Sequence, residues 1–169
     1  GRCYADESAA LVHFSNASAG FEVSFEGTTL VASIVSDGSA FPREASGNAW
    51  IYVFADGAKN YNRAVRKELG GGNEKRDYVL LSGLPEGRHT AKVLKCTEAK
   101  YGTAALFSLS TDGTFLPPPE RAQRRAEIIG DSIMSGSESM RESSTTDSKL
   151  SESENSLSSY GYIAADMLD

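Results

Sequence analysis

The tripeptide Gly130-Asp131-Ser132 is the motif in this 169-residue chain that most directly suggests chemistry. It follows the apolar stretch 126–129, which predicts a short buried strand that runs into a turn. A serine in that position is typical of a serine hydrolase, because open α/β sheets place their ligands at the carboxyl ends of strands. The alternative is that Ser132 only stabilises a turn, as one of the many serines between residues 132 and 159.

A serine hydroxyl needs a base to take its proton, and the sequence places no candidate base beside Ser132. His13 and His89 both fall among predicted strands before residue 115. We expect His89, at the start of a strand, to face the solvent. Asp131 is expected to brace the turn through its carboxylate, because adjacent side chains point apart.

The cysteines and histidines do not suggest a metal site. Two cysteines and two distant histidines lack any zinc-ligand spacing, so we expect no metal and no cofactor. Cys3 and Cys96 could form a disulfide if their strands lie side by side, or they could remain free thiols. The sequence leaves both alternatives open.

Charge and hydropathy exclude two classes of partner. The net charge is −6, and the basic residues are scattered apart from Arg121, Arg124 and Arg125, so nucleic acid is not expected as a partner. No apolar run reaches the length of a membrane span, and the N-terminus carries no signal-peptide pattern. A hydrophobic content of 40% is ordinary for a folded globular protein.

The first 115 residues predict a β-sandwich. Short apolar or alternating stretches are separated by turn signals such as Asp-Gly, and this pattern favours a jelly roll among the sandwiches. The predicted strands are 20–26, 28–35, 50–54, 77–81, 89–95 and 104–109. Trp50, Tyr52 and Phe54 alternate onto one face, where core packing is favoured over a sugar-stacking platform.

The composition changes after this region. The prolines at 117–119 predict an extended spacer over 116–125, which separates a sandwich domain (1–115) from a second segment (126–169). Within that segment, the serine-rich stretch 135–153 predicts a long mobile loop. Residues 154–168 predict a helix with Leu157, Tyr160, Ile163, Ala164, Met167 and Leu168 on one face, capped by Ser or Asn.

Several stretches together resemble a known enzyme family. Gly130-Asp131-Ser132-Ile133 after an apolar strand resembles the first motif of the SGNH (GDSL-like) hydrolases. The order of the other motifs is similar to that of the two-domain acetyl esterases of carbohydrate esterase family two. The matching stretches are Gly1-Arg2, 20–22, 25–28, 53–57, 95–99 (Lys-Cys-Thr-Glu-Ala), 154–156 and 159–165.

The resemblance implies a mostly β chain, with a jelly-roll β-sandwich followed by an incomplete α/β (SGNH hydrolase-like) segment. It implies that Ser132 is the nucleophile and that its backbone N–H is one oxyanion donor, with Gly130 and Asp131 supporting the turn. It also implies deacetylation of a plant polysaccharide such as xylan or glucomannan, and a secreted or extracytoplasmic location. A non-catalytic carbohydrate-binding or domain-docking sandwich is the alternative.

Two departures qualify what the resemblance implies. In such enzymes the catalytic His, in an Asp-x-x-His context, and the other oxyanion donors lie further along the chain. We therefore expect a chain truncated after the first βα unit, inert as an isolated esterase, with the rest of the catalytic domain as a missing partner. The second departure is Cys96, where such enzymes more often carry a basic residue.

One strand and one helix cannot bury their own apolar faces. We therefore expect the residues after Ser132 to be poorly packed or laid against the sandwich. The residues concerned are Ile128, Ile129, Ile163, Met167 and Leu168.

Overall fold

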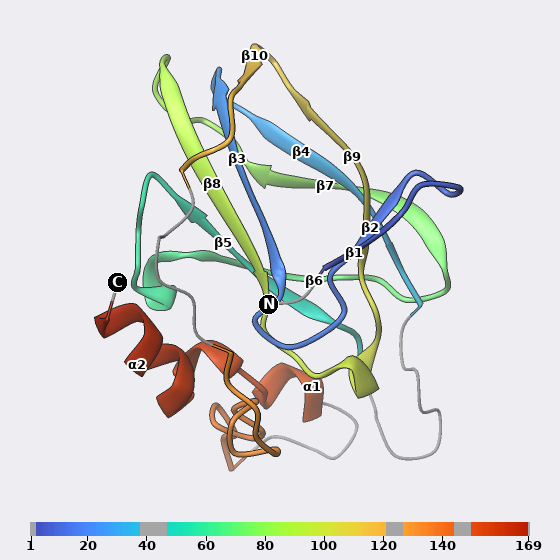
Figure 1. Ribbon diagram of the computed structural model, residues 1–169, viewed down its shortest axis with the longest axis vertical. Coiled ribbons are helices and arrows are strands. Elements are labelled where there is room, and N and C mark those ends of the chain that lie inside the picture. The colour runs from blue at the N-terminus through green and yellow to red at the C-terminus, as the bar shows by residue number, and fades with distance from the viewer. Residues whose placement is uncertain (1–2, 38–46, 121–126, 144–149, 169) are drawn as a thin grey trace.

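The computed structural model describes residues 3–37, 47–120, 127–143 and 150–168, and its main body is two antiparallel sheets packed face to face (Figure 1). The first sheet has the order β1 (Tyr4–Asp6), β2 (Leu11–His13), β9 (Ala105–Thr111), β4 (Leu30–Ser36), β7 (Glu74–Leu81). The second has the order β10 (Thr114–Leu116), β3 (Gly20–Glu26), β8 (Arg88–Lys95), β5 (Trp50–Ala55), β6 (Val65–Glu68).

The strand pairing is that of a jelly roll. β2 pairs with β9, β3 with β8, β4 with β7 and β5 with β6, so the chain forms one long nested hairpin that is rolled into two sheets. β1 and β10 add an edge strand to each sheet. The prediction of a mostly β chain with a jelly-roll sandwich is therefore confirmed.

Alternation along the strands produces the core. In β4, Leu30, Ala32 and Ile34 are fully buried while the residues between them are less so, because successive side chains point to opposite faces of a sheet. The same alternation in β5 buries Ile51 and Val53 between the sheets. The remaining fully buried residues of this core include Phe14, Phe25, Leu69, Leu80, Ala91 and Val93.

All six predicted strands are present, and the strands that the sequence did not predict are β1, β2, β6 and β10. These four are three or four residues long, which is too short for a periodic pattern to register. Asp56 and Gly57 do turn the chain with positive φ angles of 52° and 72°. A short 3-10 helix, η1 (Tyr61–Arg63), then precedes β6, so the two strands are not joined by a tight hairpin.

A second apolar cluster lies on the outer face of the second sheet. Tyr52 and Phe54 of β5, with Leu94 and Cys96 at the end of β8, are covered by Leu157 from the C-terminal part of the chain. Trp50 packs against this cluster. Core packing of the three β5 aromatic residues is thus confirmed, although they pack outside the space between the sheets.

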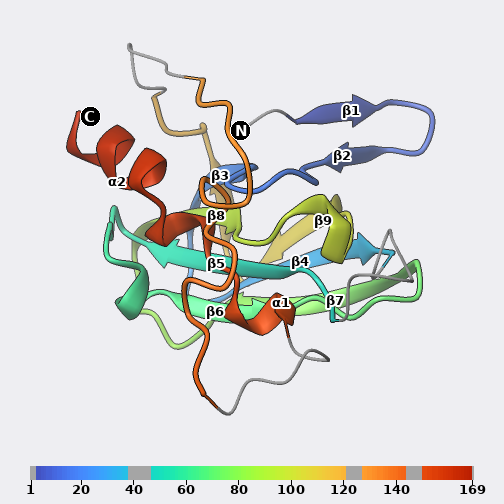
Figure 2. The ribbon, with the colours of Figure 1, turned by 90° about the horizontal axis from the view of Figure 1, so that it is seen from below.

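The C-terminal residues form short helices at one end of the sandwich (Figures 1 and 2). These are α1 (Leu150–Ser153), a 3-10 helix η4 (Ser156–Ser158) and α2 (Tyr160–Met167). The predicted single helix over 154–168 is therefore wrong in its first part. Asn155 caps η4 and Ser159 caps α2, each by accepting a backbone N–H two or three residues further on, and these caps break the chain into two helices.

The expected strand before Ser132 is not formed by its described residues. Residues 127–130 are exposed and have no ladder partner, and Ile129 is 88% exposed. A buried strand requires neighbouring strands, and both sheets of the described chain end in strands from the first 116 residues. Ala126 lies outside the described residues.

The serine-rich region is also more ordered than predicted. Residues 132–140 form consecutive turns, residues 150–153 form α1, and Ser135, Ser151 and Ser153 are buried. Part of the C-terminal segment is thus laid against the sandwich as expected. The other part stays uncovered, with large exposed fractions at Ile128, Ile129, Ile163, Met167 and Leu168.

Candidate functional site

Ser132 is exposed at the start of a compact run of turns, residues 130–137, which we call the Ser132 turn. Asp131 Oδ1 accepts the backbone N–H of Ile133 at 3.0 Å. The carbonyl of Ser132 accepts the N–H of Ser137 at 2.9 Å, and the hydroxyl oxygen of Ser135 lies 3.2 Å from that carbonyl oxygen. These bonds hold the backbone on both sides of Ser132 while its side chain faces the solvent.

Gly136 brings the Ser132 turn against the segment before η4. Its carbonyl accepts the N–H of Asn155 at 3.1 Å, and its φ is +68°. A Cβ at this position would lie 2.1 Å from the carbonyl oxygen of Asn155. The close approach of the two backbones therefore requires glycine.

Glu98, in the loop after β8, connects the Ser132 turn to the sandwich. Its Oε1 accepts the hydroxyl of Ser135, and its Oε2 pairs with Lys100 Nζ at 2.7 Å. Its backbone N–H donates to Oε1 of Glu154, just before η4. One residue of the sandwich thus binds two separate parts of the C-terminal segment.

Lys95 holds this loop in shape. Its side chain is fully buried, and Nζ donates to the carbonyls of Thr97 (2.6 Å) and Glu98 (2.9 Å) and to the Thr97 hydroxyl (3.2 Å). Burial lowers the pKa of Lys95 to about 8 because it penalises the charged form. The three acceptors offset that cost, so the loop folds around the ammonium group.

The carboxyl groups of the site have opposite pKa shifts. Burial raises the pKa of Glu154 to about 7, aided by the nearby Glu98 carboxylate. Burial also opposes ionisation of Glu98, but hydrogen bonds from Lys100 and Ser135 outweigh it and lower the pKa of Glu98. At neutral pH Glu98 is therefore ionised, whereas Glu154 is close to its titration midpoint.

A row of buried polar groups continues the site along β5 and β6. The guanidinium of Arg66 stacks over Trp50 at 4.3 Å and donates to the carbonyls of Glu152 (2.8 Å) and Glu154 (3.3 Å). Within the described ranges, Trp50 Nε1, Arg66 Nε, Ser151 Oγ, Glu154 Oε2 and Asn155 Nδ2 are buried without a hydrogen-bond partner. The contact between sandwich and C-terminal segment is therefore polar as well as apolar.

His89 is not the base for Ser132. Its ring is buried, Nδ1 bonds Asp56 Oδ2 at 2.9 Å and Nε2 bonds the Pro85 carbonyl at 2.8 Å. The expectation that it faces the solvent is wrong, because Asp56 and Pro85 draw both nitrogens inward. His89 also lies six residues before Lys95 along β8, which corresponds to about 20 Å of strand.

The two cysteines are not paired with each other. Cys3 is exposed and Cys96 is buried, and both are free thiols. Burial raises the pKa of Cys96 to about 11, which makes its thiol unreactive.

Among the described residues there is no group of three or more His, Cys, Asp or Glu side chains that could hold a metal ion. The described part of the chain also contains no helix long and apolar enough to cross a membrane.

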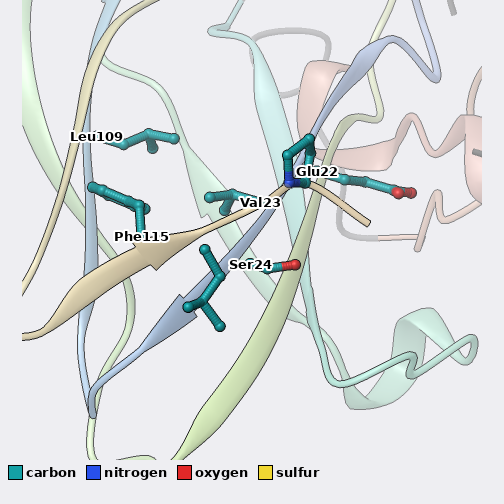
Figure 3. Close-up of a pocket in the computed structure, with 7 residues that line it drawn as sticks. Glu22, Val23, Ser24, Leu109 and Phe115 are labelled. Atoms are coloured by element: carbon teal, nitrogen blue, oxygen red, sulfur yellow. The ribbon is translucent and has the colours of Figure 1, made fainter. Parts of the chain in front are cut away.

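A shallow apolar depression lies elsewhere on the sandwich, between β3, β9 and β10. Figure 3 shows Leu109 and Phe115 on one side of it and Glu22 on the other. The remaining lining residues are Val23, Ser24, Leu116 and Pro118. Phe115 is 41% exposed, so its ring is accessible from solvent.

Glu98, Ser135 and Glu154 are site residues that the sequence did not single out. In the sequence, Glu98 and Glu154 stand only within the family-like stretches 95–99 and 154–156. The available signal was an acidic residue three positions after a strand that ends in lysine. It did not reveal the partners, which lie 37 and 56 residues away.

Comparison with known families places the first part of this chain. Residues 1–119 match the family model described as carbohydrate esterase 2 N-terminal. None of the curated proteins matches the chain.

Solved structures match nearly the whole chain. It is similar to a family two carbohydrate esterase from Cellvibrio japonicus, with 24% identity and a TM-score of 0.81 over 99% of this chain and 45% of that one. It is similar to a family two carbohydrate esterase from Clostridium thermocellum in complex with cellohexaose, with 26% identity and a TM-score of 0.79 over 99% and 47%. The acetyl xylan esterase of Butyrivibrio proteoclasticus shares the fold, with 18% identity and a TM-score of 0.71 over 96% and 45%. The chain therefore spans about half the length of these relatives.

Proposed function

Because the chain belongs to the carbohydrate esterase 2 N-terminal family, we propose that it is the N-terminal part of a serine-dependent carbohydrate acetyl esterase. The proposed substrate is an acetylated plant polysaccharide such as xylan or glucomannan. A polymer of that size is met outside the cell, so we assign the protein to a secreted or extracytoplasmic location.

The observation that carries the proposal is the exposed Ser132 in a turn that the sandwich itself holds. The solved family two structures match 99% of this chain, so the similarity extends past residue 119 into the Ser132 turn. Its backbone is tied through Asp131, Ser135 and Ser137, which leaves the hydroxyl free to meet a substrate.

We assign the reaction as acyl transfer in two steps. The Ser132 hydroxyl attacks the acetyl carbonyl, the sugar hydroxyl leaves, and water then releases acetate from the acyl-serine. Each step needs a base, and His89 is not available for that role since it is bonded at both ring nitrogens. We propose that residues further along the protein supply the base and the remaining oxyanion donors. The 169-residue chain alone would then be inactive.

We propose three parts for the chain: the sandwich (1–115), the linker (116–125) and the beginning of an SGNH-like catalytic domain (126–169). The closing contacts of the Ser132 turn with Glu98 support the view that the third part folds onto the first.

An acetyl-ester assay tests the role of Ser132. We expect the 169-residue protein to release no acetate from 4-nitrophenyl acetate or acetylxylan above the rate of its Ser132→Ala variant. A longer product of the same gene that contains a downstream Asp-x-x-His should be active, and Ser132→Ala should reduce its kcat by about 10⁶-fold. Equal activity of that longer protein with and without Ser132 would remove Ser132 as the nucleophile.

A second candidate function is sugar binding by the sandwich, which the accessible ring of Phe115 favours. Aromatic rings are common contact surfaces in binding sites. Affinity electrophoresis in xylan or glucomannan gels tests this candidate, and retardation that is lost in Phe115→Ala but kept in Ser132→Ala would support it. Trp50, Tyr52 and Phe54 are not available for this role because Leu157 and Arg66 cover them.

A further inference from the structure

We propose that Glu98 of the sandwich is a positioning residue for Ser132, which sets the geometry of the nucleophile turn from the first domain. This inference deepens the proposed function and rests on it. The sandwich would then help to position the nucleophile, in addition to any role in binding.

Glu98 is held in place by the loop that carries it and by Lys100. The loop that carries it is wrapped around Lys95 Nζ, which donates to the carbonyls of Thr97 and Glu98 and cannot donate to bulk water because the side chain is fully buried. The Thr97 hydroxyl, which receives a bond from Lys95, also accepts the backbone N–H of Trp50 at 3.2 Å and so fixes the loop to β5. Lys100 holds the far oxygen of the Glu98 carboxylate at 2.7 Å.

Ser135 connects Glu98 to the backbone around Ser132. Glu98 Oε1 accepts the Ser135 hydroxyl, whose oxygen lies 3.2 Å from the carbonyl oxygen of Ser132. The N–H of Ser135 donates to the carbonyl of Asp131 at 3.2 Å. The carboxylate therefore holds Ser135, whose backbone N–H bonds the residue before the nucleophile and whose hydroxyl oxygen lies against the carbonyl of the nucleophile itself.

Charge strengthens the contact between Glu98 and Ser135. The bond from Ser135 goes to an ionised acceptor, and such bonds are stronger than those between neutral groups. The backbone N–H of Glu98 also donates to the Glu154 carboxylate, so the Ser132 turn and the segment just before η4 are fixed to the same residue. A substitution at Glu98 should therefore loosen both together.

Amide hydrogen exchange of the full 169-residue chain, followed by NMR, tests the inference. In Glu98→Ala we expect the amides of Ser135 and Ser137 to exchange about 10-fold to 100-fold faster, from the strength of a hydrogen bond to an ionised acceptor. Glu98→Gln keeps an acceptor oxygen for Ser135 and should give a smaller increase. Ser135→Ala should reproduce the Glu98→Ala effect at Ser137.

The matched control is Glu26→Gln, which removes a carboxylate that pairs with Arg88 at 3.0 Å on the sandwich surface. It should leave the Ser135 and Ser137 amides unchanged. The amides of Phe25 and Val93, in the β3–β8 ladder, report whether a variant has lost its fold, since they should keep their protection in every variant.

A spin label at the nucleophile position gives a second measurement. In a Cys3→Ser, Ser132→Cys background only position 132 is open to a nitroxide reagent, because Cys96 is buried. The restricted component of its spectrum should be lost in Glu98→Ala and retained in Glu26→Gln. Unchanged exchange at Ser135 and Ser137 together with an unchanged label spectrum in Glu98→Ala would overturn the inference. Neither measurement depends on catalysis, so such a result differs from a failure of the esterase assay.

Discussion

Gly136 illustrates how a single residue without a side chain decides the geometry of the site. It lies one residue beyond Ser135, with a φ of +68°, and its backbone contacts Asn155. The sequence marks it only as one glycine in a serine-rich stretch. Glycine is needed here because the backbone of Asn155, which is distant in the sequence, lies close to it in the structure.

We predict that Gly136→Ala destabilises the contact between the Ser132 turn and the 150–158 segment by about 2 kcal/mol or more. The positive φ alone costs about 1–2 kcal/mol, and the new methyl group would meet the Asn155 carbonyl. Faster hydrogen exchange of the Asn155 amide measures the effect.

The control for this prediction is Gly57→Ala. Gly57 has a φ of +72° and no atom within 4 Å of the added Cβ, so its substitution introduces backbone strain without a steric clash. An equal loss of stability in the two variants would show that the contact with Asn155 is energetically unimportant.

Residue types alone predicted a candidate nucleophile. Gly130, Asp131 and Ser132 were identified because a Gly-Asp-Ser sequence after an apolar stretch is a local pattern. Glu98 and Glu154 were not, because their importance comes from contacts with residues distant in sequence. The burial of His89 depends on Asp56 and Pro85 and could not be seen from its neighbours in the sequence.

At the scale of elements, β5 is the strand that joins the two halves of the chain. Its inward residues belong to the sandwich core, and its outward residues Tyr52 and Phe54 form the platform on which Leu157 sits. Because β5 is apolar on both faces, its sequence predicted a buried strand. It did not indicate that the cover on one face is the C-terminal segment.

We predict that Leu157→Ala weakens the docking of the C-terminal segment by about 2–4 kcal/mol. Leu157 is fully buried against β5 and β8, and its removal leaves a cavity in addition to the lost apolar contact. Limited proteolysis should then cut the chain after residue 127 at a much higher rate, while the sandwich stays intact.

Leu168→Ala is the matched control, because Leu168 is 64% exposed and its loss should not change the rate of cleavage. A wild-type segment that is cut as readily as the Leu157→Ala segment would mean that the docking seen in the structure is not stable in solution.

At the scale of the whole molecule, the sandwich and the C-terminal segment meet over a charged interface that should respond to pH. Glu154 is the titrating group, and the charged groups that face it are Glu98, Lys95 and Lys100. Burial raises its pKa from 4.5 to about 7 in the docked state. Its second carboxyl oxygen has no hydrogen-bond partner among the described residues.

We predict that docking weakens as the pH rises from about 4.5 to about 7, by about 3 kcal/mol, and then stays constant. In that window the undocked chain has lost the Glu154 proton that the docked chain keeps, so raising the pH favours undocking. Hydrogen exchange of the Leu157 amide at several pH values, corrected for the intrinsic rate, measures this dependence.

Glu154→Gln should remove the pH dependence, because the amide stays neutral and still offers an oxygen to the Glu98 N–H. A pH dependence of the same size in Glu154→Gln would assign it to another group. His89 and Asp56 lie toward the start of β8, so their titration should affect the sandwich and leave the Leu157 amide unchanged.

The sequence by itself determined the jelly-roll class, the main strands and the Gly130-Asp131-Ser132 motif. Each of these depends on short-range information: a two-residue alternation, turn residues, or adjacent residue types. The tertiary structure decided that residues 127–130 form no strand, that the serine-rich stretch partly packs, and that Glu98 holds the Ser132 turn. These outcomes depend on which surfaces are available to cover a segment, and local periodicity carries no information about a partner 37 or 56 residues away.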